Sequence, residues 1–496
     1  MDEKLNWKFY ERNDRKVAGL VREGSLEAIT GTGWGFLDRF FSFLYEIGFF
    51  KIIDTPGRGY TRILIPVARL ITTYSVKILL GISSMNKIPD LLFREVSLLK
   101  LIGFTAAQVK EGSCRRGKGG SIPINKNTLS RMLERLSTLE VNEILASTVK
   151  TLAKKKFIKG SVFVLDATDI PTTDKCEGRG VKTVKIKKYD KLTKEFIETE
   201  KTTYGFKLIV IWEIKSRVVV AAKVVKTQEH ESKHALSLVE TARQNLGESK
   251  ISLLLIDAGF VDGKTLFKLK KIFKTDFIVR ARKNMHVSID ARSLAQTSGC
   301  FKGQSKEYSC IGIENLSSYS QYNCVEALKN IYKKDFKSFN LNAVVVTGYK
   351  DRKITKGRET VFLTSLDVKN PCSVADLYDN RSLIENRLFR ELKQGWNISK
   401  IPMKKKSAVI SHIILTLVMY SLNACYQTEE GGKLAEKGIR KLRDADLSSI
   451  HKIIVFAENY FAIFDIEEYS LIVRSPPKEF FRINPIEAKK RLGLKD

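Results

Sequence analysis

Three side chains suited to phosphate-ester chemistry stand at helical spacing in the C-terminal half of the chain: Tyr378, Arg381 and Glu385. Because Arg381 and Glu385 follow Tyr378 by three and seven residues, the phenol, the guanidinium and the carboxylate would lie on one face of a helix. Upstream, Ser373 and Asp376 follow the Ser-x-x-acid pattern of a helix N-terminus, which predicts a helix from about residue 374 onward. Arginine binds phosphate oxygens and carboxylates bind metal ions. An exposed amphipathic helix with a solvated ion pair would explain the same residues.

Two aspartates farther upstream each follow an apolar run. Asp166 follows residues 162–165 (VFVL), and Asp257 follows residues 251–256 (ISLLLI). Continuous apolar runs predict strands buried on both faces of a sheet. Because α/β folds bind ligands at the carboxyl ends of such strands, both carboxylates could act together with Glu385. Taken singly, each aspartate could equally be a turn residue or a helix N-cap.

The elements between these acids follow a defined order. After Asp166 and a Lys-rich stretch, the composition predicts a hairpin, then a helix, the strand that ends at Asp257, a second helix and a further strand. The corresponding ranges are 204–214 with 217–225, 231–246, 251–256, 260–273 and 276–282. The helix of Glu385 comes last, after an interruption of about 90 residues. This is the element order of the ribonuclease H-like α/β fold.

The sequence resembles DDE transposases of the insertion-sequence-four family, whose third acidic motif is Tyr-x-x-Arg-x-x-x-Glu followed by a Lys. The resemblance extends from about residue 160 to about residue 425, and residues 389–394 (FRELKQ) are similar to the string that follows the Glu in that family. It implies that Asp166, Asp257 and Glu385 are the catalytic, metal-binding acids. Tyr378 and Arg381 would be their DNA-binding companions.

Two positions depart from the family pattern. The family usually has Lys seven positions after the Glu, where this chain has Leu392; the nearest lysine is Lys393. At about 100° per residue, Lys393 would point about 80° away from Glu385, but its flexible side chain could still bind a DNA phosphate. Ser382 replaces a Trp that is common after the Arg.

Three carboxylates suit a site with two Mg²⁺ ions, for which Mn²⁺ could substitute. Two such ions about 3.5–4 Å apart activate a hydroxyl and stabilise a leaving oxygen, and each takes one or two carboxylates. We expect Asp166 to bridge both ions, with Asp257 and Glu385 each holding one. Arg381 would bind a phosphate near the scissile bond, and Tyr378 would order the DNA end. Asp169, three residues after Asp166, competes for the role of first acid.

The charge balance favours a nucleic-acid partner. Lys and Arg number 86 against 55 Asp and Glu, a formal charge of +31. Such an excess favours salt-dependent binding to DNA, although basic composition alone also occurs in proteins without this function. Candidate backbone contacts are residues 115–118, 182–194 and 404–406. Lys404 and Lys405 are the best placed, because they follow the Glu385 helix closely.

The length of 496 residues predicts several domains. We expect a helical N-terminal DNA-binding domain (1–155) and a ribonuclease H-like core in two parts (156–282 and 371–428). A β-rich insertion (283–370) would separate these parts, and a C-terminal region (429–496) could serve dimerisation.

Several other classes of protein are disfavoured. Seven cysteines without a C-x-x-C pair argue against zinc and for a reduced, cytosolic setting. The resemblance to insertion-sequence transposases implies a prokaryotic cytoplasm, in association with the nucleoid. His230 and His234 lack a third metal ligand. The apolar run 409–425 is too short to span a membrane and predicts a core helix. Residues 259–265 are one residue short of a phosphate-binding loop, which leaves a nucleotide triphosphatase a weak alternative.

The expected function is transposition of an insertion sequence. The protein would bind terminal inverted repeats in double-stranded DNA, cut there and join the ends to target DNA. Synapsis of two ends favours a homodimer. One alternative is a DNA-binding protein of the same fold without catalysis, against which the intact Asp166, Asp257 and Glu385 argue. A nuclease without strand transfer is the other, and the sequence does not separate it from a transposase.

Overall fold

The protein divides into two compact units, each described here by itself. The computed structural model describes residues 10–32, 35–54, 56, 65–105, 108–109, 112, 123–189, 196–247, 251–297, 299–316, 341–348, 359–431, 438–447, 452–473 and 485–494. The first unit combines residues 1–144 with 391–496, and the second comprises residues 145–390. Residues 115–118, one of the predicted basic clusters, lie outside the described residues.

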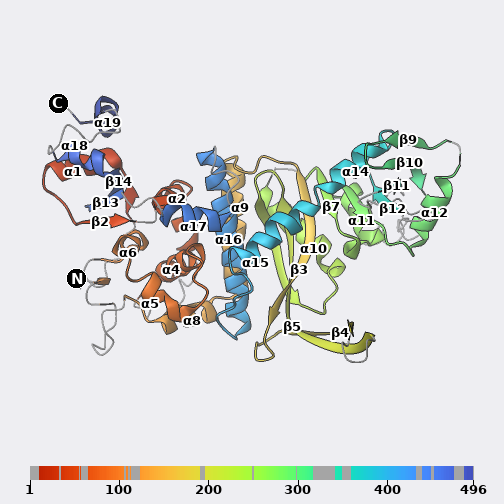
Figure 1. Ribbon diagram of the computed structural model, residues 1–496, viewed down its shortest axis with the longest axis horizontal. Helices are drawn as coiled ribbons and strands as arrows, with labels where there is room; N and C mark the ends of the chain where they lie inside the picture. The colour runs from red at the N-terminus through yellow and green to blue at the C-terminus, as the bar shows by residue number, and fades with distance from the viewer. Residues whose placement is uncertain are drawn as a thin grey trace. The chain divides into compact units, whose positions relative to one another are not determined.

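The second unit is built on a large mixed sheet (Figure 1). Five of its strands lie in the order β6 (Val218–Lys226), β5 (Phe196–Glu213), β3 (Val162–Thr172), β7 (Leu253–Ile256) and β8 (Asp276–Arg280). β5 is antiparallel to both β3 and β6, whereas β7 is parallel to β3 and β8 is parallel to β7. The predicted strands and the predicted hairpin are therefore confirmed.

Helices and further strands extend this sheet. The two predicted helices are α10 (Ser232–Leu246), which contacts β6, and α11 (Gly263–Lys271), which contacts β8. Beyond β8 the sheet continues through β12 (Thr360–Thr364), β11 (Leu341–Thr347), β10 (Ser309–Leu316) and β9 (Phe301–Gln304), with α12 (His286–Leu294) against β10, β11 and β12. At the other end, β4 (Gly180–Tyr189) pairs with the first half of β5. Segment 283–370 thus contributes strands to the sheet that carries Asp166.

The predicted helix around Glu385 is interrupted. α14 (Pro371–Asp379) begins after Asn370 and contacts β8, β9, β10 and β11. Its Tyr378 also packs on Phe362 of β12. After a turn, η5 (Ile384–Phe389) is π-helical and continues into α15 (Arg390–Gln394). The helix is confirmed, but its predicted N-cap is wrong, because the hydroxyl of Ser373 donates to the carbonyl of Asn370 within the first turn.

The first unit is built around α16 (Lys406–Glu430). α16 contacts α2 (Gly35–Glu46), α4 (Val67–Leu79) and α8 (Lys126–Arg135). It is long and apolar enough to cross a membrane, the one such helix in the described part of the chain, but its apolar stretch is wholly buried in the protein. The prediction of a core helix is therefore confirmed. The smaller helices are α3 (Phe49–Ile53), η2 (Met85–Lys87), α5 (Ile88–Leu91), α6 (Val96–Ile102) and α17 (Ile439–Leu447); α9 (Thr138–Lys154) crosses the division between the units.

A second, four-stranded sheet joins segments from both ends of the chain. Its order is β1 (Glu11–Arg12), β14 (Tyr460–Asp465), β13 (Lys452–Ala457) and β2 (Ala28–Thr32). The helices α1 (Asp14–Arg22), α18 (Ile466–Ile472) and α19 (Pro485–Leu492) pack with it around a small apolar core. The N-terminal segment is thus not purely helical, since it supplies two of these strands.

Candidate active site

The three predicted acids meet at one atom, the Nη2 nitrogen of Arg381. It lies 2.8 Å from Oδ2 of Asp166, 3.1 Å from Oδ1 of Asp257 and 3.1 Å from Oε1 of Glu385. The structure therefore brings together three carboxylates that are distant in sequence. Their catalytic role stays a prediction at this point.

Strand register explains why two of these acids are neighbours. β3 and β7 run parallel, and their last paired residues are Leu165 and Ile256. Asp166 and Asp257 each come one residue later, so both follow the paired segment at the same edge. The main chain holds one oxygen of each: Ala167 N–H donates to Asp166 Oδ1 at 2.8 Å, and Gly259 N–H donates to Asp257 Oδ2 at 3.3 Å. The other oxygen of each carboxylate faces Arg381.

Tyr378 lies in the core, where the DNA contact expected of it has no room. It is 5% exposed, and its hydroxyl donates to the carbonyl of Ile256 at 3.2 Å. Its ring packs on Phe362 with 4.5 Å between the centroids, and burial raises the pKa of its hydroxyl. The expectation of direct contact is corrected: Tyr378 ties α14 to the end of β7, one residue before Asp257.

Asp169 stands apart from the carboxylate cluster. Its side chain is 52% exposed, accepts a hydrogen bond from the Thr227 hydroxyl at 3.1 Å and lies 4.0 Å from Nζ of Lys182. Among the described contacts it has none with Arg381. The geometry therefore favours Asp166 over Asp169 as the first acid.

Burial dominates the electrostatics of Asp166. It raises the pKa of this carboxyl to about 7; Arg381 and the Ala167 N–H oppose the rise, and Asp257 and Glu385 add to it. The pKa of Arg381 is itself raised, because the three carboxylates outweigh its own burial. The buried Nε of Arg381 has no hydrogen-bond acceptor among the described residues. The guanidinium is thus a permanent cation that retains one unused donor.

The donor set suits a hard divalent cation. Three carboxylates supply only oxygen ligands, as Mg²⁺ and Mn²⁺ prefer. Because all three oxygens lie within 3.1 Å of one nitrogen, no two of them are more than about 6 Å apart. As they stand, no three His, Cys, Asp or Glu side chains in the described residues are close enough to hold a metal. Arg381 lies at the point on which the carboxylates converge, so a metal ion placed there would require it to give up some of these bonds.

A fourth carboxylate, that of Glu231, was not predicted from the sequence and supports the Asp257 loop. Lys207 on β5 donates to Oε2 of Glu231 at 2.5 Å and to the carbonyl of Glu229 at 2.9 Å. The other oxygen of Glu231 lies only 2.4 Å from where a Cβ on Gly259 would stand. Glu231 therefore packs directly against the residue whose N–H holds Asp257. No local pattern could have found it, since the contact joins separate elements.

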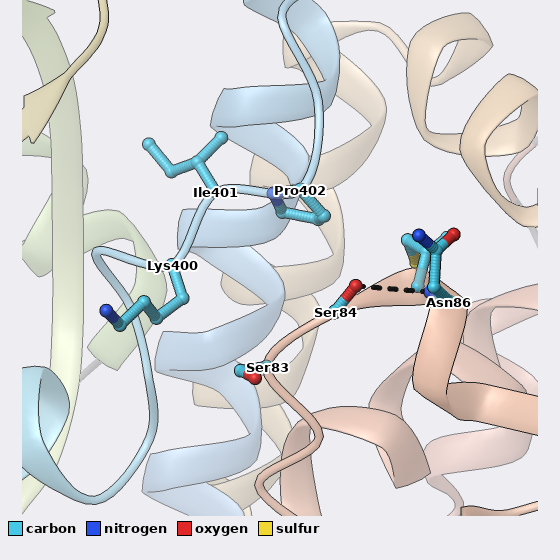
Figure 2. A pocket seen from close by; sticks show the side chains of 7 residues that line it. Ser83, Ser84, Asn86, Lys400, Ile401 and Pro402 are labelled. Carbon is cyan, nitrogen blue, oxygen red and sulfur yellow. Dashed lines mark hydrogen bonds between the residues drawn. The ribbon is translucent and has the colours of Figure 1, made fainter. Parts of the chain in front are cut away.

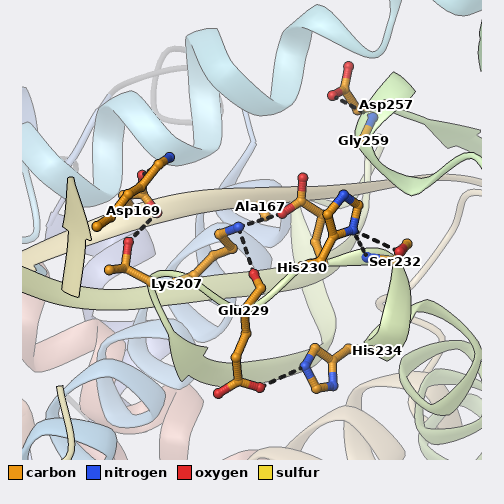
Figure 3. Close-up of polar contacts among 12 residues, drawn as sticks. Ala167, Asp169, Lys207, Glu229, His230, Ser232, His234, Asp257 and Gly259 are labelled. Atoms are coloured by element: carbon orange, nitrogen blue, oxygen red, sulfur yellow. Dashed lines mark hydrogen bonds and ion pairs between the residues drawn. The ribbon is translucent and has the colours of Figure 1, made fainter. Parts of the chain in front are cut away.

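The two histidines of this region are engaged locally. His230 Nδ1 is 2.8 Å from the Ser232 hydroxyl, and His234 Nε2 is 3.2 Å from Oε2 of Glu229 (Figure 3). Each histidine thus has one ring nitrogen in contact with a neighbouring side chain.

Lys393, Lys404 and Lys405, three of the predicted DNA contacts, are exposed and belong to the first unit, whereas the three acids belong to the second. Lys405 precedes α16 and lies 3.4 Å from Glu134. Lys404 is its exposed neighbour, and Lys393 lies on α15. The predicted 80° offset of Lys393 assumed a regular α-helix and is wrong, because η5 is π-helical between Glu385 and α15. The DNA contacts of these lysines stay predictions.

A hollow of about 390 Å³ lies in the first unit (Figure 2). Its lining is mostly polar and contains none of the three acids: Ser83, Ser84, Met85, Asn86, Lys400, Ile401 and Pro402. The carboxylate cluster, in the other unit, is therefore the stronger candidate for chemistry.

A family model of known proteins matches the part of the chain that carries the three acids. A family model described as the transposase DDE domain matches residues 158–422, a stretch that contains all three acids. No curated protein sequence matches significantly. Among solved structures, a cryo-EM structure of the piggyBac transposase synaptic complex with hairpin DNA is similar at 10% identity and a TM-score of 0.39, over 92% of this chain and 85% of that one.

The raised pKa of Asp166 predicts a pH-dependent stability. The folded pKa of about 7 exceeds the ordinary value of 3.8, so the folded state retains a proton that the unfolded state loses. Stability should therefore fall as the pH rises from about 4 to about 7, by at most about 1.4 kcal/mol per pH unit. Asp166→Asn should remove this contribution, as urea denaturation between pH 4.5 and 7.5 would measure. Asp169→Asn, outside the cluster, should keep the wild-type profile; parallel profiles for all three proteins would contradict the assignment.

The contact between Glu231 and Gly259 predicts that Gly259→Ala is destabilising. The added methyl would stand 2.4 Å from Oε1 of Glu231, so this carboxylate must shift, and the shift strains the bond between its other oxygen and Lys207. Overpacking of this kind costs about 1–3 kcal/mol in the free energy of unfolding. Gly19→Ala in α1, where no atom lies within 4 Å of the new Cβ, is the matched control and should be neutral or stabilising. Equal urea midpoints for the two variants would rule out a tight contact.

Proposed function

Because the chain belongs to the family of transposase DDE domains, we propose that it is the transposase of an insertion sequence, which cuts DNA at the element's ends and joins them to a target. One observation carries this proposal: the carboxylates of Asp166, Asp257 and Glu385 converge on the single cationic nitrogen of Arg381. A cluster of three acids that binds one cation is suited to binding others. The Tyr-x-x-Arg-x-x-x-Glu spacing supports the narrower assignment to the insertion-sequence-four family.

The catalytic core is, we infer, ribonuclease H-like. In chain order, the strands β3, β5, β6, β7 and β8 lie in the spatial order 3-2-1-4-5. The first three are antiparallel neighbours, and the last two follow in parallel. This order supports the inference independently of the three acids.

Asp166, Asp257 and Glu385 would hold two divalent ions, Mg²⁺ or Mn²⁺. When bound, such ions supply activation of the attacking hydroxyl and stabilisation of the leaving oxygen. The chain prepares its side of the site by fixing Asp166 through the Ala167 N–H and Asp257 through the Gly259 N–H. Once the carboxylates release Arg381, its guanidinium can bind a phosphate of the DNA in a bidentate manner. Arg381 thus has two successive sets of partners.

Other residues would position the site or bind DNA. Tyr378 and Glu231 support the Asp257 loop from two sides, through the Ile256 carbonyl and through Gly259. Lys393, Lys404 and Lys405 would contact the backbone of terminal-repeat or target DNA. The substrate has two ends, so a homodimer is the proposed active form, acting in the cytoplasm at the nucleoid.

Glu385→Gln should abolish cleavage while leaving DNA binding intact. Loss of one of three acidic ligands should lower the cleavage rate by about 10³-fold, a loss of about 4 kcal/mol of transition-state stabilisation. The substrate is a labelled duplex that carries the element's own terminal repeat, tested with Mg²⁺, with Mn²⁺ and with chelator.

Asp169→Asn is the matched control for this experiment, since its carboxylate lies on the same strand as Asp166 but outside the cluster. It should cleave like the wild type, whereas Asp166→Asn should be inactive. The opposite pattern would reassign the first acid. Wild-type binding without cleavage in any metal would refute the proposed activity.

A further inference from the structure

A two-stranded ribbon extends from the main sheet (Figure 1). β4 pairs with residues 196–205 of β5, whereas β3 and β6 pair only with residues 204–213. Residues 182–189 and 196–203, called the ribbon here, therefore lie beyond the other described strands. At about 3.3 Å per residue, eight residues extend by about 26 Å. The ribbon contains most of one sequence-predicted basic cluster, which the proposed active site does not use.

Among the described side chains, one face of the ribbon carries two lysines and no acid of the ribbon. Lys182 lies opposite Thr203, and Lys201 lies opposite Val184. Because directly paired residues and alternate residues share a face, Lys182, Val184 and Lys201 lie on the same side. All three are exposed. This set of residues is called the basic face.

The opposite face is closer to neutral. There Lys185 pairs across the strands with Glu200, so that the two charges are adjacent. Among the described side chains of the ribbon, the positive charge that no acid of the ribbon itself compensates is therefore that of Lys182 and Lys201. Lys182 in addition lies 4.0 Å from Asp169 of β3.

The base of the ribbon lies close to the carboxylate cluster. Nζ of Lys182 is 4.0 Å from Oδ2 of Asp169, and Asp169 lies on β3 three residues after Asp166. Three residues of extended strand span about 10 Å, and the backbone of one DNA strand advances about 3.4 Å per nucleotide. The base of the ribbon thus lies about 10 Å along β3 from Asp166, although the odd separation projects Asp166 and Asp169 from opposite faces of the strand. Lys182 keeps 46% of its side chain exposed despite its contact with Asp169.

We propose that the basic face of the ribbon binds the phosphate backbone of duplex DNA next to the cleaved bond. This inference rests on the proposed function for its ligand. A two-stranded ribbon is narrow enough to follow the major groove, and lysines supply contacts to phosphates without reading sequence. The ribbon therefore increases the affinity for DNA and orients the DNA at the active site, whereas other residues recognise the DNA sequence.

The test compares Lys182→Gln/Lys201→Gln with a control that has the same loss of charge, both in a Glu385→Gln background that prevents cleavage. The control is Lys302→Gln/Lys306→Gln, two exposed lysines at the β9 end of the same sheet, with β4 at the other end. Binding of a 40-base-pair duplex is measured between 50 and 200 mM salt. Loss of two phosphate contacts should reduce the slope of log affinity against log salt by about 1.8. The ribbon variant should also bind less tightly than the control, by about tenfold at the lower salt.

Equal slopes and affinities for the two variants would overturn the proposal, and the lysines would then serve only to keep an exposed edge strand from pairing with other chains. Cleavage is also measured for each double variant with Glu385 intact. This second measurement distinguishes failure of the ribbon proposal from failure of the proposed function. The ribbon variant should regain the wild-type rate at saturating DNA, because its defect lies in KM. If the wild type binds DNA but never cleaves it, the proposed activity fails while the ribbon proposal is still decided by the salt slopes.

Discussion

The fold of the second unit depends on one electrostatic constraint, which is that three carboxylates must share a small volume. Like charges at such distances repel, and burial of Asp166 adds a desolvation cost. Arg381 offsets both, since a single nitrogen contacts all three acids. The parallel pairing of β3 with β7 supplies two of the carboxylates, and the interrupted helix supplies the third together with the arginine. Each element is needed to complete the cluster.

The parts that sequence could predict are those with a local signal. The apolar runs before Asp166 and Asp257 predicted strands because a strand buried on both faces must be apolar throughout. Helical spacing predicted that Arg381 and Glu385 meet, and their ion pair is 3.1 Å long. An acid one residue beyond an apolar run was also informative, because the pairing of β3 with β7 ends there.

The parts that could not be predicted depend on distant contacts or on local breaks in regular structure. Tyr378 was expected to contact DNA, but its hydroxyl donates to the carbonyl of Ile256 in the core, a distant contact without a local signal. The π-helical segment after Glu385 changes the angle between successive residues without an obvious sequence signal. Glu231 contacts Gly259 only because α10 and the Asp257 loop meet in space. Pairing of β1 and β2 with β13 and β14 likewise joins opposite ends of the chain.

Charge balance explains why such a site would need metal ions before it could accept DNA. With Asp166 ionised, three carboxylates and one guanidinium leave about two uncompensated negative charges, which would repel a phosphodiester. Protonation of Asp166, whose pKa is about 7, lowers this excess but removes a metal ligand. Two divalent cations would instead reverse the sign of the local charge and free Arg381 for the phosphate. Without metal ions, Arg381 keeps the three acids together. With metal ions bound, the same arginine would face the substrate, so the replacement of Arg381 by metal ions and the binding of DNA would occur together.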